Sequence, residues 1–240
     1  MQISENAPNL SYLNINSYKA VDNPKGCDDY VEEHLNVLKD FGVKKVTSLN
    51  ETWKHNPNSY VIVVENPEEN KYVAGARVEI QNPDFQLPIE QAIGEIDDSI
   101  YDLIKSYSGN RTGEICGLWS SSRVAGNGVA FMLIKSSIVL ANLLNMESVF
   151  ALCSPYTVSM FTKVGFQIET SIGKNGTFYY PKQDLIATAM VIKDLKVLAT
   201  ATKDSNHEIF NLVLNPFQNL IEQGPSRKIE VAYNLDPFNK

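Results

Sequence analysis

The segment best suited to chemistry is Arg123-Val124-Ala125-Gly126-Asn127-Gly128, in which a single residue separates two glycines. Glycine has no side chain to keep an anion away from the backbone, and it adopts positive φ freely. If a helix follows directly, its free N–H groups lie at the positive end of the helix dipole, where phosphates bind. The segment is therefore a candidate pyrophosphate cradle, although paired glycines also occur in plain strand-to-helix turns.

The flanking residues predict the strand and the helix that such a cradle needs. Glu114 to Trp119 is a short apolar run typical of a strand, and Val129 to Leu144 is apolar almost all round, as in a helix buried on a sheet. Glu147 to Cys153 then predicts another strand, and Pro155 to Val164 a short helix that ends before Gly165. The order is strand, loop, helix, strand, helix.

Upstream of these elements, the hydrophobic pattern predicts further helices and strands. Helices are expected at Asp28 to Phe41 and, as one long element, over residues 88–107. A short strand is expected at Val43 to Leu49, and Tyr60 to Glu65 should pair antiparallel with Tyr72 to Ile80 as a hairpin.

Downstream, three short runs complete the expected sheet: Phe166 to Ser171, Thr177 to Tyr180 and Thr188 to Ile192. Residues 196–240 form an addition with a helix that starts at the capping-box spacing of Ser205 and Glu208, and with a last edge strand at Lys228 to Leu235. The alternation of patterns predicts an α/β or α+β sheet with helices on its faces. We expect residues 1–195 to form one domain that includes an inserted helix near 88–107, with residues 196–240 packed on the same domain as an extension.

Composition excludes several classes of protein. The 240 residues are 43% hydrophobic and 20% charged, as in an ordinary globular chain with a substantial core. A net charge of -7 lacks the basic excess of nucleic-acid-binding proteins. The sequence shows no apolar run long enough to span a membrane, and its first residues show no basic stretch followed by an apolar one. A cytoplasmic location is therefore expected. The cysteines and histidines are scattered, so we expect no disulfide framework and no metal site: Cys27, Cys116, Cys153, His34, His55 and His207.

The loop resembles the acyl-CoA signature of the Gcn5-related N-acetyltransferase (GNAT) superfamily, Arg/Gln-x-x-Gly-x-Gly/Ala, through Arg123, Gly126 and Gly128. The resemblance extends to the order of elements over roughly residues 60–192, including the Gly165-Phe166 pair after the short helix. A weaker resemblance, to the homoserine-lactone synthase and N-acyl amino acid synthase branch, rests on the long helix before the fourth strand and on residues 180–185.

The resemblance implies a mixed, mostly antiparallel central sheet that is flanked by helices and splayed between its fourth and fifth strands. It also implies that acetyl-CoA or another acyl-CoA binds along the fourth strand and the loop. The residues expected to hold it are Leu118, Trp119, Ser120, Arg123, Val124, Ala125, Gly126, Asn127, Gly128 and Val129. Lys135 and Lys163 are either neighbours of the cofactor phosphates, a contact for a carrier protein, or solvated surface lysines.

The implied reaction is direct attack of an amine on the thioester, which requires a base. Glu114 is the first candidate and Glu79 the second; either is alternatively a solvated strand-end carboxylate. Many relatives protonate the departing thiolate with a tyrosine at the position of Phe161. Here we expect Tyr156 or Ser159 on the same short helix, or solvent, to supply the proton.

The leading hypothesis is therefore an N-acyltransferase that moves an acetyl or longer acyl group from acyl-CoA to a small amine. One alternative is an autoinducer-like or N-acyl amino acid synthase that uses an acyl-carrier protein. The other is a module that binds acyl-CoA without catalysis, which Phe161 favours. The sequence leaves the acceptor amine, the acyl length and the oligomeric state open.

Overall fold

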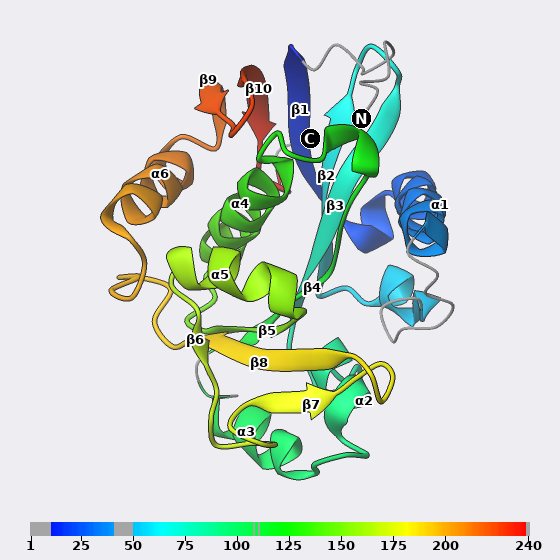
Figure 1. The fold of residues 1–240 in the computed structure, drawn as a ribbon, viewed down its shortest axis with the longest axis vertical. Helices are drawn as coiled ribbons and strands as arrows, with labels where there is room; N and C mark the ends of the chain where they lie inside the picture. The colour runs from blue at the N-terminus through cyan, green and yellow to red at the C-terminus, as the bar shows by residue number, and fades with distance from the viewer. Residues whose placement is uncertain (1–10, 41–49, 108, 110, 239–240) are drawn as a thin grey trace.

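The computed structural model describes residues 11–40, 50–107, 109 and 111–238 (Figure 1). Within this part of the chain, ten strands form one sheet, in which β7 pairs with β8 and the others follow the order β6-β8-β5-β4-β3-β2-β1-β10-β9. The strands are β1 (Tyr12–Lys19), β2 (Ser59–Asn66), β3 (Lys71–Ile80), β4 (Gly113–Ser120), β5 (Val149–Cys153), β6 (Gln167–Ile168), β7 (Thr177–Tyr179), β8 (Ile186–Ile192), β9 (Phe217–Gln223) and β10 (Lys228–Asn234). The helices are α1 (Pro24–Asp40), α2 (Pro88–Ile93), α3 (Ser99–Tyr107), α4 (Val129–Leu143), α5 (Pro155–Lys163) and α6 (Lys203–Leu214).

The sheet is mostly antiparallel, with parallel pairing at β4–β5 and at β1–β10. β4 and β5 are in register only at Glu114 and Phe150, so they separate beyond that point. The expected mixed sheet with a splay between its fourth and fifth strands is confirmed. Backbone groups on the β5 side of β4 are thereby left outside the sheet ladder.

A bulge bends β4 where the splay begins. Between the pairs Gly75–Trp119 and Arg77–Cys116, β4 contains one residue more than β3. Gly117 lies in this interval with a φ of +57°, which L side chains rarely adopt. The Tyr30 hydroxyl of α1 donates a hydrogen bond to the Gly117 carbonyl and so holds the bulge in place.

Helices cover both faces of the sheet, with α1 on one side and α4 and α6 on the other (Figure 1). Alternate residues of β2 face opposite ways: Val61 and Val63 pack in the cluster beneath α1, while Ile62 and Val64 pack in the cluster that includes α4. This double burial explains why β2 reads as a continuous apolar run.

The hairpin, the buried helix and the strand and helix that follow it are confirmed as β2–β3, α4, β5 and α5. The prediction of one helix over residues 88–107 is wrong, because α2 ends at Ile93, with Gly94 as its C-cap, and α3 starts at Ser99. Asp97 separates them: its Oδ1 accepts hydrogen bonds from the Ser99 N–H and hydroxyl, which starts a new helix.

Two helix starts also differ from expectation. The first helix begins at Pro24 rather than Asp28, since proline is well suited to a first helical turn. The last helix is capped by Thr202, whose Oγ1 accepts from the Ser205 N–H, so Ser205 is not the capping residue. The strand expected at residues 43–49 lies outside the described residues.

Strands β1 and β9 have no counterpart in the sequence-based expectation. β1 lies between β2 and β10, and β9 forms the outer edge next to β10. β10 is therefore an interior strand, and its expected position at the edge is wrong. The predicted strand at Phe166 to Ser171 shrinks to the two residues of β6.

Candidate functional site

The glycine loop has the backbone geometry of an anion cradle. Ser122–Val124 form a single 3₁₀ turn, Gly126 has a φ of +73°, and Gly128 caps α4 with a φ of +81°. Among the described residues, the backbone N–H groups of Gly126, Gly128, Val129 and Ala130 meet no protein acceptor. These unpaired donors cluster at the positive end of a 15-residue helix, as phosphate binding requires.

Side chains of the loop brace it rather than point at a ligand. The Asn127 amide donates to the carbonyls of Val124 (3.3 Å) and Ala125 (3.1 Å), and Asn127 is 6% exposed. Arg123 forms an ion pair with Glu69 at 2.6 Å. Both residues were expected to hold the cofactor, yet neither lines the cavity beside the loop.

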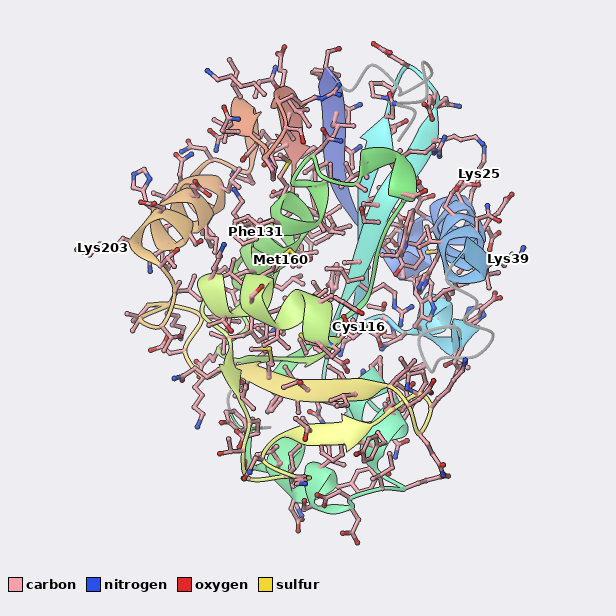
Figure 2. All side chains as sticks on the ribbon, viewed as in Figure 1. Lys25, Lys39, Cys116, Phe131, Met160 and Lys203 are labelled. Atoms are coloured by element: carbon pink, nitrogen blue, oxygen red, sulfur yellow. The ribbon has the colours of Figure 1, made fainter. Side chains whose placement is uncertain are left out.

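That cavity has a volume of about 710 Å³ and opens between α4 and α5. Figure 2 shows Phe131 of α4 and Met160 of α5 beside each other in this region, and both line the cavity. Lys135 and Lys163 also line it. Six of the residues expected at the cofactor lie in its wall: Ser120, Val124, Ala125, Gly126, Gly128 and Val129.

A second cavity, of about 250 Å³, lies further back along β4. Its walls come from β4, from the end of β5, from α5, and from α1 and α2 on the other side. They include Glu114, Cys116, Leu118, Ser154, Thr157 and Phe161. Because Ser120 lines the first cavity and Leu118 the second, β4 runs from one to the other beside the splay. Trp119 faces the opposite way, into the cluster under α1.

Glu114 is the acidic side chain of the second cavity, and it is 2% exposed. Its Oε2 accepts a hydrogen bond of 2.7 Å from the Ile89 N–H at the start of α2. Burial raises the pKa of Glu114 well above 4.5, although the bond from Ile89 acts in the opposite direction. A carboxyl group with a raised pKa in a cavity has the properties of a general base.

Glu79 is committed to other partners. Its Oε1 accepts from Arg77 Nε at 3.0 Å and from Cys116 Sγ at 3.5 Å. Glu79 does not line the second cavity. The structure therefore brings Glu114, at the start of β4, and not Glu79 into the wall of the second cavity.

Helix α5 divides its side chains between the two cavities. Thr157 and Phe161, one turn apart, line the second, while Met160 and Lys163 line the first. Tyr156 is 90% exposed and lines neither. Thr157 was absent from the sequence-based candidates, although its position four residues before Phe161 places both on one helix face.

His34 of α1 is a further residue that sequence reasoning missed. It lines the second cavity and stacks on Trp119, with ring centroids 6.2 Å apart. Burial, with a smaller contribution from the Arg77 charge, lowers the pKa of His34 to about 4. His34 is therefore a neutral wall residue at neutral pH.

Cys27, Cys116 and Cys153 are free thiols. The described residues contain no group of three His, Cys, Asp or Glu side chains placed to hold a metal ion. Within the same residues, none of the helices combines the length and apolar character that crossing a membrane requires.

The structure is similar to solved structures of N-acyltransferases. FeeM, an N-acyl amino acid synthase from uncultured soil microbes, aligns with 78% of this chain and 99% of its own, at 13% identity and a TM-score of 0.59. MesI, a CoA-dependent acyl-homoserine lactone synthase, aligns with 83% of this chain and 94% of its own, at 11% identity and a TM-score of 0.53. An acyl-CoA N-acyltransferase from Pseudomonas aeruginosa aligns with 75% of this chain and 98% of its own, at 13% identity and a TM-score of 0.52.

No family model and no curated protein sequence matches the chain. The similarity therefore resides in the fold, which is that of the GNAT acyltransferases expected from the sequence. The solved structures that share this fold include an N-acyl amino acid synthase and an acyl-homoserine lactone synthase. The weaker resemblance based on residues 180–185 and on the region before β4 pointed to these two kinds of enzyme.

Proposed function

We propose that this chain is an N-acyltransferase that moves an acetyl or longer acyl group from an acyl-CoA thioester to a small amine. The observation that carries the proposal is the set of unpaired N–H groups at the start of α4, which face a 710 Å³ cavity beside the splayed strands. Residues 126–130 would bind the pyrophosphate of CoA, and the exposed lysine of α5, Lys163, would add a positive charge to the same cavity.

The splay accounts for the position of the thioester. An extended pantetheine arm that leaves the loop along β4 can take the hydrogen bonds that β5 does not use. This course leads from the first cavity toward the second, where Leu118 and Phe161 are found. The thioester would then lie within the space that Glu114 also lines.

In the proposed reaction, the amine nitrogen attacks the thioester carbonyl carbon, the C–S bond breaks, and the CoA thiolate leaves. Glu114 accepts the amine proton, because it is the acidic group of the second cavity. The thiolate takes a proton from a hydroxyl on α5 or from water. Thr157 is better placed for this than Tyr156, since Thr157 lines the cavity and Tyr156 is exposed.

A second candidate function is the synthesis of N-acyl amino acids with a carrier-protein donor. Its support is the alignment with almost all of FeeM, itself an N-acyl amino acid synthase. The volume of the second cavity, about 250 Å³, equals that of roughly eight water molecules in the liquid. This volume favours a short acyl group with a small acceptor, so acyl-CoA transfer to a small amine remains the leading proposal.

The first test is thermal unfolding of the full chain with acetyl-CoA, palmitoyl-CoA, free CoA and NAD. A ligand that binds the native state raises the melting temperature by mass action. We expect a rise with CoA species, none with NAD, and loss of the effect in Gly126→Trp. Gly109→Trp is the matched control, since no atom of the described residues beyond its chain neighbours lies within 4 Å of a Cβ added at Gly109.

The second test is release of free CoA thiol from acetyl-CoA with a panel of small amines and amino acids. Amine-dependent release supports catalysis, and release only with carrier-protein thioesters supports the second candidate. Binding of CoA without turnover in either assay identifies a non-catalytic acyl-CoA-binding module. A folded protein that no CoA species stabilises rules out the proposed donor.

A further inference from the structure

The C-terminal extension forms one wall of the cavity beside the glycine loop. Figure 1 shows α6 alongside α4, and the β9–β10 hairpin at the end of the sheet next to β1. The extension contributes five residues to the lining of the 710 Å³ cavity: Glu208, Glu222, Gln223, Gly224 and Pro225. By contrast, the second cavity takes none of its lining from the described part of residues 196–240. The extension therefore belongs to the donor side of the molecule.

The turn between β9 and β10 lies directly on the glycine loop. The Ser226 hydroxyl donates a hydrogen bond of 2.8 Å to the Gly126 carbonyl. A Cβ added at Gly224 would lie 2.3 Å from the Asn127 carbonyl oxygen, so only glycine permits this approach. A Cβ at Gly128 would lie 3.3 Å from Pro225. The same loop residues thus meet the turn and present the unpaired N–H groups.

An ion-pair cluster around a buried lysine fixes the extension to α4. Lys135 is 2% exposed, and its ammonium group donates to Glu208 of α6 at 2.7 Å and to Glu222 of β9 at 3.2 Å. The Tyr233 hydroxyl of β10 donates to the other oxygen of Glu222 at 2.6 Å. A buried ammonium group requires such partners, because its desolvation is otherwise costly. The wall is therefore held at a fixed distance from α4.

Apolar packing makes the extension an integral part of the fold. Ile209 and Leu212 of α6, and Ile229 and Val231 of β10, are almost completely buried in the same cluster as α4. β10 also pairs in parallel with β1 over five residue pairs. A wall set in the core is preorganised, so a ligand that contacts it does not have to order it.

From these contacts we propose that the β9–β10 turn, residues 223–226, is part of the donor-binding site and contacts the phosphorylated end of the CoA thioester. The inference rests on the proposed function. A pyrophosphate held by the N–H groups of residues 126–130 lies against a loop that the turn already touches at Gly126, Asn127 and Gly128. The turn supplies part of the wall of the same cavity, and Ser226 occupies the Gly126 carbonyl through its hydrogen bond.

The test is calorimetric titration of the full chain with free CoA and acetyl-CoA. In Gly224→Ala the new methyl group collides with the Asn127 backbone, so the turn must move away from the loop. We expect binding to weaken by at least about tenfold, equally for both ligands, because the turn contacts CoA and not the acyl group. Ser226→Ala removes the single bond to Gly126 and should weaken binding about threefold.

The matched control is Gly173→Ala, in which the added Cβ lies 2.5 Å from Phe178, outside both cavities. It should lower the melting temperature and leave the CoA dissociation constant unchanged. Gly224→Ala and Ser226→Ala proteins that fold and bind CoA like the wild type overturn the inference but leave the proposed function standing. Wild-type protein that is folded and binds neither ligand overturns both.

Discussion

Replacement of His34 by phenylalanine should make the protein more resistant to acid. His34 is 4% exposed and lies between Trp119, on which it stacks, and Tyr30, which it meets edge-on at 5.9 Å. Phenylalanine keeps an aromatic ring in this position but cannot take up a proton. The pKa of His34 is lowered from 6.5 to about 4, first by burial and then by the Arg77 charge.

The variant should be more resistant to acid because, in the wild type, the unfolded state takes up a proton on His34 at a higher pH than the folded state does. Above a pH of 6.5 the imidazole is neutral in both states, and its contribution to stability is fully present. As the pH falls below 6.5, the unfolded chain takes up the proton first, so stability is lost until the folded pKa near 4 is passed. A difference of about 2.5 pH units corresponds to about 3 kcal/mol in total, of which about 2 kcal/mol is lost by pH 5.

Urea unfolding at about pH 7.5 and about pH 5 provides the assay, with the free energy of unfolding extrapolated to water at each pH. Wild type and His34→Phe share all other titrating groups, so the difference between their free energies isolates the imidazole. We expect this difference to change by about 2 kcal/mol in favour of the variant between the two pH values. A difference that stays constant would refute the reasoning and show that His34 is solvated in the folded protein.

Three further predictions concern the two cavities. Glu114→Gln should lower turnover by at least about a hundredfold, as measured by thiol release, while leaving the CoA dissociation constant unchanged. Because the pKa of Glu114 is raised, its contribution to stability is present below 4.5 and lost as the pH rises through the folded pKa, so in urea unfolding the variant should gain on the wild type with rising pH. Lys135→Met leaves the Glu222 carboxylate, whose side chain is only 14% exposed, without its cation and should cost about 3 kcal/mol. In a double-mutant cycle, Glu222→Gln should lower the free energy of unfolding less in the Lys135→Met background than in the wild type. Phe161→Tyr adds a hydroxyl at the second cavity and should raise kcat by on the order of tenfold if thiolate protonation limits the rate.

Each of these has an outcome that would contradict it. Wild-type turnover in Glu114→Gln would remove Glu114 as the base. Additive free energies in the Lys135 and Glu222 cycle would show that the buried contact contributes nothing. An unchanged kcat in Phe161→Tyr, with the variant folded, would mean that another group or water already protonates the thiolate efficiently.

The sequence by itself determined the loop and the order of elements around it. Gly126 and Gly128 could be identified because positive φ and close approach to an anion both depend on the absence of a side chain, which is a local property. The β2–β3 hairpin and the helix α4 followed from hydrophobic periodicity, which is also local. Glu114 could be proposed as the base from its place at the start of β4.

Tertiary structure decided which residues meet. The sequence ranked Glu114 before Glu79 from position alone, and only the fold shows that Glu114 lines the second cavity whereas Glu79 pairs with Arg77. The sequence did not indicate His34, which reaches the second cavity from a helix about 80 residues before β4 in the chain. The weak alternation of β1 and β9 became strand only through long-range pairing, of β1 with β2 and β10 and of β9 with β10. The position of residues 196–240 beside the glycine loop likewise depends on contacts of Lys135 with Glu208 and Glu222, and such long-range pairing has no local signature in a single sequence.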